Sequence, residues 1–207
     1  MVDDENIDAK SLFNEKFLQQ LKFLKKDNVA INKKLVQDMR GQADNIFSHI
    51  MPGLRETFEN FKVVSVEEKL YVPFNDVFFK GYIDLVIQTD DGKYHVIDWK
   101  TCSWGWDSKR KADRITSYQI TLYKNFFAEK HNIDPDNIET YFALLKRTAK
   151  SNNVEIIRVT SGRKKIENSL KLLGRAVYNI KHDNFVKNKL SCTSGYGCEF
   201  YKTKYCR

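Results

Sequence analysis

The sequence lacks the features of a membrane-embedded or secreted protein. None of its apolar runs approaches the roughly 20 consecutive residues that a membrane helix needs. The first five residues include three acidic side chains, whereas a secretory signal peptide begins with positive charge. Four cysteines in 207 residues are too few for a disulfide scaffold. We therefore expect an intracellular, cytoplasmic protein with reduced thiols and no membrane partner.

The sequence also lacks internal repeats and low-complexity segments. Hydrophobic residues make up 42% of the chain and aromatic residues 13%, which is typical of a folded domain rather than a disordered one. The net charge is +8 and the isoelectric point is about 9.2. This balance suits a polyanionic partner such as nucleic acid, although excess lysine also serves solubility.

Hydrophobic periodicity predicts an alternation of helices and strands. Helices are expected over 8–26, over 31–50 with an interruption at Gly41, in a new turn from Pro52, over 113–130 and over 163–182; strands are expected over 63–71, 80–87, 94–101, 140–146 and 153–159. This order predicts an α/β fold with a central mixed β-sheet flanked by helices. We expect a single domain made of an N-terminal helical segment (1–62) packed on a core (63–186), followed by a cysteine-containing tail (187–207).

The stretch with the most information is a pair of apolar runs, Lys80–Ile87 and Tyr94–Thr101, joined through a polar link that contains Asp91 and Gly92. Asp-Gly between β-branched runs predicts a β-hairpin. The expected connection is a type I′ turn, in which both central residues have positive φ.

The predicted hairpin places Asp84 and Asp98 on neighbouring antiparallel strands. Because side chains alternate along a strand, Asp98 and Lys100 are expected on one face, with Ile97 and Trp99 on the other. Carboxylates are rare in such apolar runs unless they are paired or bind a metal. A hard divalent cation held by the aspartate oxygens would keep both carboxylates ionised.

Three short patterns occur in order between residues 63 and 125: Gly81-x-x-Asp84, Asp98-x-Lys100-Thr101 and Gln119-x-x-x-Tyr123. Together they resemble the PD-(D/E)XK nuclease superfamily, in its RecB-like exonuclease branch. Within that branch the chain resembles the mitochondrial genome maintenance exonucleases, the CRISPR-adaptation nucleases and their phage relatives. The resemblance implies a restriction-endonuclease-like core.

The resemblance also implies roles for single residues. Asp84, Asp98 and the backbone carbonyl of Trp99 would bind one or two Mg²⁺ or Mn²⁺ ions, and Lys100 would orient the nucleophile and stabilise the transition state. Glu67 would hold a metal-bound water or a second ion. Two solvated carboxylates, Glu67 and its neighbour, are an equally good interpretation of that strand end.

In relatives a residue of an N-terminal helix completes the metal site. Glu15, Asp44 and His49 are the candidates in this chain, and no motif decides between them.

Nucleic-acid contacts are expected from two further segments. Gln119 and Tyr123 lie one helical turn apart, and in the family this pair flanks the catalytic cleft and contacts the strand. The loop after the hairpin combines two indoles with a basic cluster, which would suit single-stranded DNA; alternatively its tryptophans plug the core. The candidate contacts in and after the loop are Trp104, Lys109, Arg110 and Arg114.

The four cysteines raise the question of an iron-sulfur cluster or Zn²⁺. CRISPR-adaptation nucleases hold a cluster with three C-terminal cysteines and one upstream cysteine, and this chain has Cys102, Cys192, Cys198 and Cys206. The tail spacing departs from that pattern and no cysteine precedes Cys102. We expect a degenerate remnant packed as small apolar side chains, with a bound cluster or Zn²⁺ as the alternative.

The sequence therefore predicts a Mg²⁺- or Mn²⁺-dependent DNA exonuclease acting on single strands or free ends in replication, recombination or repair, in the host cytoplasm if it is phage-encoded. Two alternatives remain. One is a catalytically silent nucleic-acid-binding or assembly protein with the nuclease fold, and the other is a structure-specific endonuclease.

Overall fold

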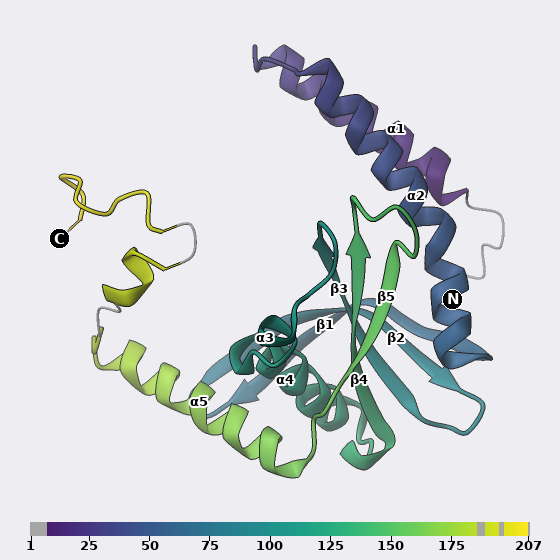
Figure 1. Ribbon diagram of the computed structural model, residues 1–207. Helices are drawn as coiled ribbons and strands as arrows, with labels where there is room; N and C mark the ends of the chain where they lie inside the picture. The colour runs from purple at the N-terminus through teal and green to yellow at the C-terminus, as the bar shows by residue number, and fades with distance from the viewer. Residues whose placement is uncertain (1–7, 186–188, 195–196, 207) are drawn as a thin grey trace. The chain divides into compact units, whose positions relative to one another are not determined.

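A mixed five-stranded sheet organises the chain, and its strands follow sequence order, β1-β2-β3-β4-β5 (Figure 1). The computed structural model describes residues 8–185, 189–194 and 197–206. All pairs of neighbouring strands are antiparallel except β3 with β4, which are parallel. The strands are β1 (Phe61–Phe74), β2 (Val77–Thr89), β3 (Tyr94–Cys102), β4 (Ile138–Lys146) and β5 (Val154–Val159). This mixed sheet with flanking helices confirms the predicted fold class.

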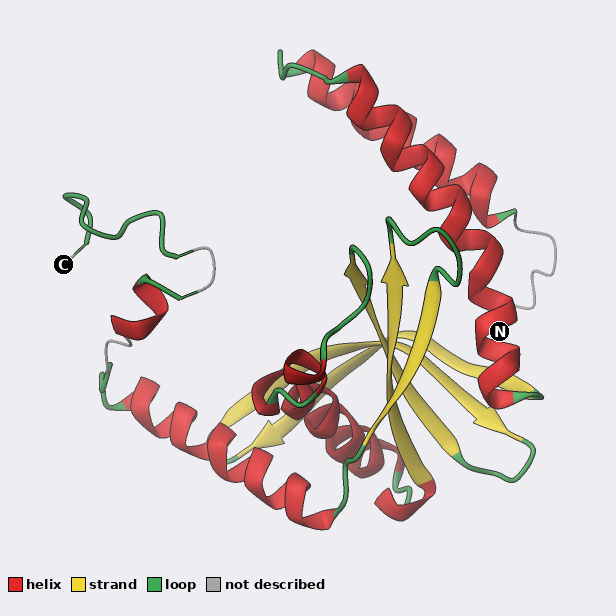
Figure 2. Ribbon diagram, viewed as in Figure 1, coloured by secondary structure: helices red, strands yellow, loops and turns green. Residues whose placement is uncertain are grey.

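The helices alternate with the strands much as the periodicity predicts (Figure 2). They are α1 (Ala9–Lys26), α2 (Lys33–Phe58), α3 (Ser108–Lys111), α4 (Arg114–His131) and α5 (Arg163–Lys181), with 3₁₀ turns η1 (Pro135–Asn137) and η2 (Lys189–Cys192). The sequence did not indicate the short α3, η1 or η2. Within the described residues, no helix combines the length and the apolar character that a membrane crossing requires.

The two faces of the sheet are covered by different helices. On one face, Leu54 and Phe58 of α2 join a buried cluster that also contains Leu85, Ile87, Ile97, Tyr141 and Ala143. The other face packs against α4, where Phe79 of β2 stacks on Phe126 at 4.2 Å between ring centroids. Because side chains alternate along β3 and β4, the residues between the members of the first cluster face α4.

Helix α2 is one uninterrupted helix, so the predicted break at Gly41 and the predicted new start at Pro52 are both wrong. A helical glycine costs only about 1 kcal/mol relative to alanine, which does not end a helix. The buried side chains of α2 lie on both sides of Pro52, with Ile46 before it and Leu54 and Phe58 after it, and their packing holds the helix together there.

The hairpin between β2 and β3 is confirmed, but its predicted type I′ turn is wrong. Only Gly92 has a positive φ, 81°, whereas Asp91 does not. The N–H of Gly92 donates to the Thr89 carbonyl at 2.9 Å, and the N–H of Thr89 donates to the Lys93 carbonyl at 3.1 Å. This is the three-residue hairpin loop with one left-handed residue, which places the same glycine in a different turn.

The first two strands, β1 and β2, are longer than the periodicity predicts. β1 and β2 continue to a tight turn between Phe74 and Val77, with Asn75 at a φ of 51°. In the part of β2 near this turn, Gly81 packs against Tyr123 of α4. A Cβ built on Gly81 would be 2.7 Å from Tyr123 Cε1 and 3.2 Å from Phe79 Cε1. A glycine is therefore required at this position by close packing.

We predict that Gly81→Ala lowers the free energy of unfolding by about 1 to 3 kcal/mol, because the new methyl group overpacks the contact with a buried tyrosine ring. Urea unfolding measures the change. Gly41→Ala is the matched control, since nothing lies within 4 Å of its Cβ position. That variant should gain about 0.5 to 1 kcal/mol. Equal effects of the two substitutions would contradict the packing argument.

A second prediction concerns Glu68 of β1, whose side chain is 12% exposed. Its Oε1 accepts hydrogen bonds from Lys130 Nζ and from His131 Nε2, both at the end of α4. Burial raises the pKa of Glu68, but these two bonds outweigh it and lower the pKa below the ordinary value of 4.5. The depressed pKa means that this stabilisation is complete above about pH 5 and is lost as the pH falls through the folded-state pKa.

Glu68→Gln should therefore cost about 1 kcal/mol of unfolding free energy at neutral pH. The difference from wild type should shrink as the pH is lowered from about pH 7 to below about pH 4. Urea unfolding across this range tests the prediction. A difference that is the same at both ends would show that Glu68 acts by packing and not by charge.

Candidate active site

The candidate site lies where β2 and β3 separate. The antiparallel pairing of these strands ends at Leu85 and Ile97, so that Asp84 and Asp98 come directly after the last pair. In place of a further backbone pair, Asp84 Oδ2 accepts a hydrogen bond from the Trp99 N–H at 2.7 Å. The two aspartates are therefore held next to each other by the sheet and by one side-chain bond to the backbone.

Asp98 is a buried carboxylate with a single cationic neighbour. It is 3% exposed, and its Oδ2 lies 2.6 Å from Lys100 Nζ. The contact is an ion pair without hydrogen-bond geometry, so this oxygen has no hydrogen-bond donor in the part of the chain that the structure describes. Burial raises the pKa of Asp98 above its ordinary value, with the negative charge of Asp84 acting in the same direction and Lys100 opposing both.

A chain of contacts joins this pair to α4. Lys100 Nζ donates to Gln119 Oε1 at 3.0 Å, and Gln119 Nε2 donates to the Tyr123 hydroxyl oxygen at 3.2 Å. Tyr123 in turn packs on Gly81. The residues of all three sequence patterns therefore meet on the α4 face of the sheet.

The residues present fit a divalent cation. Two carboxylates and the Trp99 carbonyl are hard oxygen donors. The Lys100 ammonium is the single group of opposite charge at the buried Oδ2 of Asp98, and with Asp84 beside it the two carboxylates leave one negative charge that a bound cation would balance. Among the described residues, no group of three or more histidine, cysteine, aspartate or glutamate side chains converges on one point. Glu67 therefore does not join the two aspartates in this structure.

Glu67 has two unusual properties all the same. It is exposed and has a φ of 50°, which is uncommon for a residue other than glycine and costs energy. The flanking pairs of β1 and β2, Val66 with Leu85 and Glu68 with Ile83, bracket Glu67 and Asp84, which are not paired themselves. Its neighbour Glu68 is bound to α4, as described above.

The three candidates on the N-terminal helices have local contacts. Glu15 accepts from Gln19 Nε2 at 2.9 Å, Asp44 forms an ion pair with Lys10 at 3.2 Å, and His49 Nδ1 lies 2.7 Å from the Asn45 carbonyl oxygen. None of them forms part of a group with Asp84 and Asp98.

The loop after β3 uses its two tryptophans differently. Trp104 is 75% exposed, whereas Trp106 is 7% exposed and lies under the Arg110 guanidinium, 4.9 Å from its ring. Each of the two interpretations of the loop thus applies to one indole. Lys109 and Arg114 are exposed, and Arg114 lies over the Tyr118 ring at 5.9 Å. The sequence pattern did not distinguish Trp106 from Trp104, because both flank the same glycine.

The cysteines are free thiols. Cys102, at the end of β3, is partly buried, and burial raises the pKa of its thiol. In the tail, Cys192 is partly buried in η2, but Cys198 and Cys206 are exposed. The expectation that the tail cysteines pack as small apolar side chains is therefore wrong for these two, because the described residues 197–206 form turns and not a packed element. A bound cluster or Zn²⁺ remains a hypothesis.

A comparison with solved structures finds proteins of similar fold. A crystal structure of a protein from Eubacterium rectale, described as a "Putative exonuclease", has a TM-score of 0.52 at 11% sequence identity, over 88% of this chain and 71% of that one. A crystal structure of SSO0001 has a TM-score of 0.39 at 15% identity, over 79% of this chain and 68% of that one. A search of curated protein sequences finds no match.

The family comparison covers nearly the whole chain. The family model for the PD-(D/E)XK nuclease superfamily matches residues 2–203. The patterns that meet on the α4 face are those by which the chain resembles this superfamily. The chain therefore belongs to the PD-(D/E)XK nuclease superfamily.

Proposed function

We propose that this protein is a metal-dependent DNA exonuclease that hydrolyses phosphodiester bonds in single-stranded or end-containing DNA, in replication, recombination or repair. The observation that carries the proposal is the chain of contacts from Asp98 through Lys100 and Gln119 to Tyr123, with Asp84 beside it. A buried acid, a partly exposed cation and a polar helix edge next to each other are more than a packed sheet requires.

Each residue of the candidate site has a role that suits its chemistry. Asp84, Asp98 and the Trp99 carbonyl would hold Mg²⁺ or Mn²⁺, with Glu67 as a further candidate. A divalent cation bound there supplies charge neutralisation at the scissile phosphate and lowers the pKa of the attacking water. Lys100, whose side chain is 28% exposed, can reach a substrate phosphate and orient the nucleophile while it stays paired with Asp98. Gln119 fixes the position of the Lys100 ammonium group.

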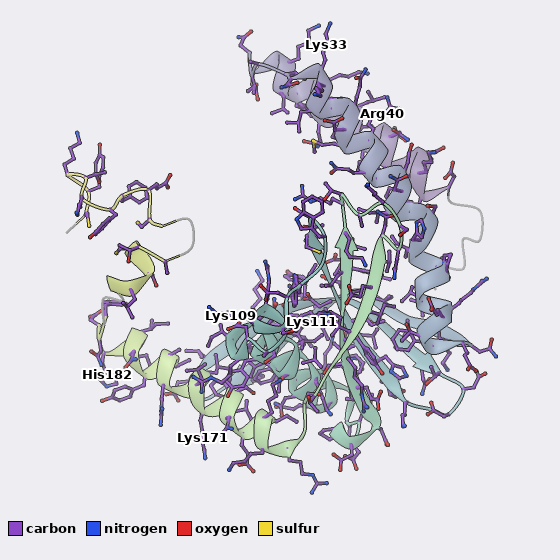
Figure 3. The ribbon with its side chains drawn as sticks, viewed as in Figure 1. Lys33, Arg40, Lys109, Lys111, Lys171 and His182 are labelled. Atoms are coloured by element: carbon purple, nitrogen blue, oxygen red, sulfur yellow. The ribbon has the colours of Figure 1, made fainter. Side chains whose placement is uncertain are left out.

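The distribution of charge supports a nucleic-acid substrate. Residues 22–34, at the end of α1 and the start of α2, contain five lysines and one aspartate, a net charge of +4 and half of the chain total of +8. No ion pair within the described residues involves these lysines, and all are exposed; Figure 3 labels Lys33 and Arg40 on this part of α2. Together with Trp104, Lys109, Arg110 and Arg114, they form basic and aromatic surface that suits a DNA strand.

Two alternatives differ in measurable ways. A catalytically silent binding or assembly protein would bind DNA without cleaving it, although Asp84, Asp98 and Lys100 are all present. A structure-specific endonuclease would cleave DNA that has no ends. The Gln119–Tyr123 pair favours the exonuclease.

We predict that the protein degrades linear single-stranded DNA in Mg²⁺ or Mn²⁺, that EDTA abolishes the activity, and that covalently closed circular single strands resist it. The physical reason is that two carboxylates next to one lysine cannot activate water at a phosphodiester without a cation. Gel analysis of end-labelled and circular substrates measures all three outcomes. Cleavage that survives complete chelation would remove the metal assignment, and equal cleavage of circles would favour an endonuclease.

We also predict that Lys100→Ala lowers the cleavage rate by about 10²- to 10³-fold with little loss of DNA affinity, since its ammonium acts at the reacting phosphate. Lys62→Ala, an exposed lysine near the start of β1, removes the same charge and should keep nearly full activity.

Removing Lys100 leaves the buried Asp98 unpaired, so the fold must be checked by thermal unfolding. Lys100→Arg keeps the positive charge and should retain the fold, but it should also be slow, because a guanidinium does not replace an ammonium at a phosphate. A fast Lys100→Arg and a fast Lys100→Ala would together mean that the motif is accidental.

A further inference from the structure

A cavity of about 270 Å³ lies on the α4 face of the sheet, next to the candidate active site. It is formed by the loop after β3, by α4, by β4 and β5, and by the first turn of α5. Its lining includes Trp106, Lys111, Ser117, Phe142, Thr160 and Lys165. Drug-sized ligands occupy pockets of about 300 to 1,000 Å³, so this cavity suits a smaller group.

The cavity shares a wall with the candidate catalytic residues. Phe142 of β4 is the register partner of Asp98, and Lys100 Nζ lies 5.8 Å from the centroid of its ring. The ring of Trp106 lies 5.1 Å from the ring of Phe142 on centroids. A strand whose scissile phosphate lies at Lys100 therefore has the cavity directly beside it.

The cavity contains a cation without a counter-ion. Lys165 is partly buried, and its side chain has no ion pair or hydrogen bond with any residue that the structure describes. Burial lowers the pKa of Lys165, with no carboxylate to oppose the shift. Its cationic neighbours are already paired: Lys111 with Glu155 at 2.8 Å, and Arg158 with Glu139 at 2.7 Å.

The position of Lys165 at the start of α5 makes its unpaired charge less favourable. The first three residues of this helix, Arg163, Lys164 and Lys165, are all cations, and no acidic residue lies in the first turn. The helix dipole disfavours positive charge at this end. Arg163 is paired with Asp136 at 2.6 Å and Lys164 with Glu167 at 3.1 Å, whereas Lys165 is not paired. An anion in the cavity would supply the missing counter-ion of Lys165 and would be favoured by the helix dipole.

The rest of the lining suits a nucleotide. Trp106 and Phe142 supply aromatic surface, and Thr160 supplies a hydroxyl group. Trp106 is 7% exposed, and its Nε1–H is buried with no hydrogen-bond acceptor in the described part of the chain. The unpaired cation that lines the cavity, with one unsatisfied donor in the side chain of Trp106 beside it, favours a ligand that carries negative charge.

We propose that this cavity is a phosphate subsite, in which Lys165, in the first turn of α5, holds a phosphate group of the nucleic-acid strand adjacent to the scissile one. The proposal rests on the proposed function, because it takes the strand to pass Lys100.

The test measures DNA binding by fluorescence anisotropy in EDTA, so that no cleavage takes place. Lys165→Gln should weaken the binding of a short single-stranded oligonucleotide roughly tenfold. It should also reduce the slope of log affinity against log salt by about 0.7, the value for one phosphate contact on a single strand. Lys165→Arg, which keeps the charge, should recover part of the affinity. Thermal unfolding checks that each variant is folded.

Lys164→Gln is the matched control. It removes the same charge from the next residue, which is exposed and already paired, and should change affinity by about twofold or less. Equal losses in the two variants would overturn the proposal in favour of a diffuse basic surface. An unchanged affinity of Lys165→Gln would overturn it as well.

Two further binding experiments determine which phosphate group occupies the subsite. If Lys165→Gln weakens binding only of 5′-phosphorylated oligonucleotides, the subsite takes a terminal phosphate; if it weakens 5′-hydroxyl oligonucleotides equally, the subsite takes an internal one. Inorganic phosphate should compete with DNA for wild type more strongly than for Lys165→Gln, and equal competition would count against the subsite.

The outcome is separable from that of the proposed function. If the wild-type protein does not cleave DNA, the proposed nuclease activity is wrong, but the comparison of DNA binding between the variants still tests the subsite. If the wild type cleaves DNA and the Lys165→Gln variant binds and cleaves it equally well, the phosphate subsite is wrong and the proposed nuclease activity stands.

Discussion

The ion pair between Asp98 and Lys100 is the interaction on which the candidate site depends. A carboxylate that is 3% exposed is costly to ionise, and the single ammonium 2.6 Å away opposes that cost. The sheet makes this arrangement possible, because β3 continues as a partner of β4 after it has separated from β2. The end of the β2–β3 pairing frees Asp84 to bind the Trp99 N–H and brings a second carboxylate to the first.

The same pair orients the helix above it. Lys100 contacts Asp98 and Gln119 together, so the ammonium group links the sheet to α4. On the opposite face, α2 packs mainly on apolar side chains of β2, β3 and β4, together with the rings of His95 and Tyr141. Both faces therefore stabilise the fold by burial, and the α4 face also carries the polar residues of the candidate site.

Most of the fold could be predicted from the sequence because its signals are local. The Asp91-Gly92 link predicted the hairpin, the alternation around Asp98 predicted the side chains that share a face, and the spacing of Gln119 and Tyr123 placed them together on a helix. What failed depended on tertiary packing. Gly41 did not end α2 because a helical glycine costs only about 1 kcal/mol, and Pro52 did not end it because the buried residues Ile46, Leu54 and Phe58 on its two sides hold the helix. The exposure of Cys198 could not be predicted either, since it depends on what packs against the tail.

The sequence could not predict that Lys165 lacks a counter-ion. It stands in a row of three cations that reads as a solvated surface, and its neighbours in that row do form ion pairs. Only the folded chain shows that one of the three turns toward a cavity and lacks a carboxylate. The difference between Trp104 and Trp106 is of the same kind.

Gly81 and Tyr123 are 42 positions apart in the chain, yet they form a single steric unit. The tyrosine ring occupies the space that any side chain at position 81 would need, and the same ring supports Gln119, which positions Lys100. A larger residue at 81 would therefore need a smaller one at 123 to relieve the clash fully, and that exchange would remove the support of Lys100, the candidate catalytic lysine. The glycine that begins the first motif and the tyrosine that ends the last are thus coupled through one contact.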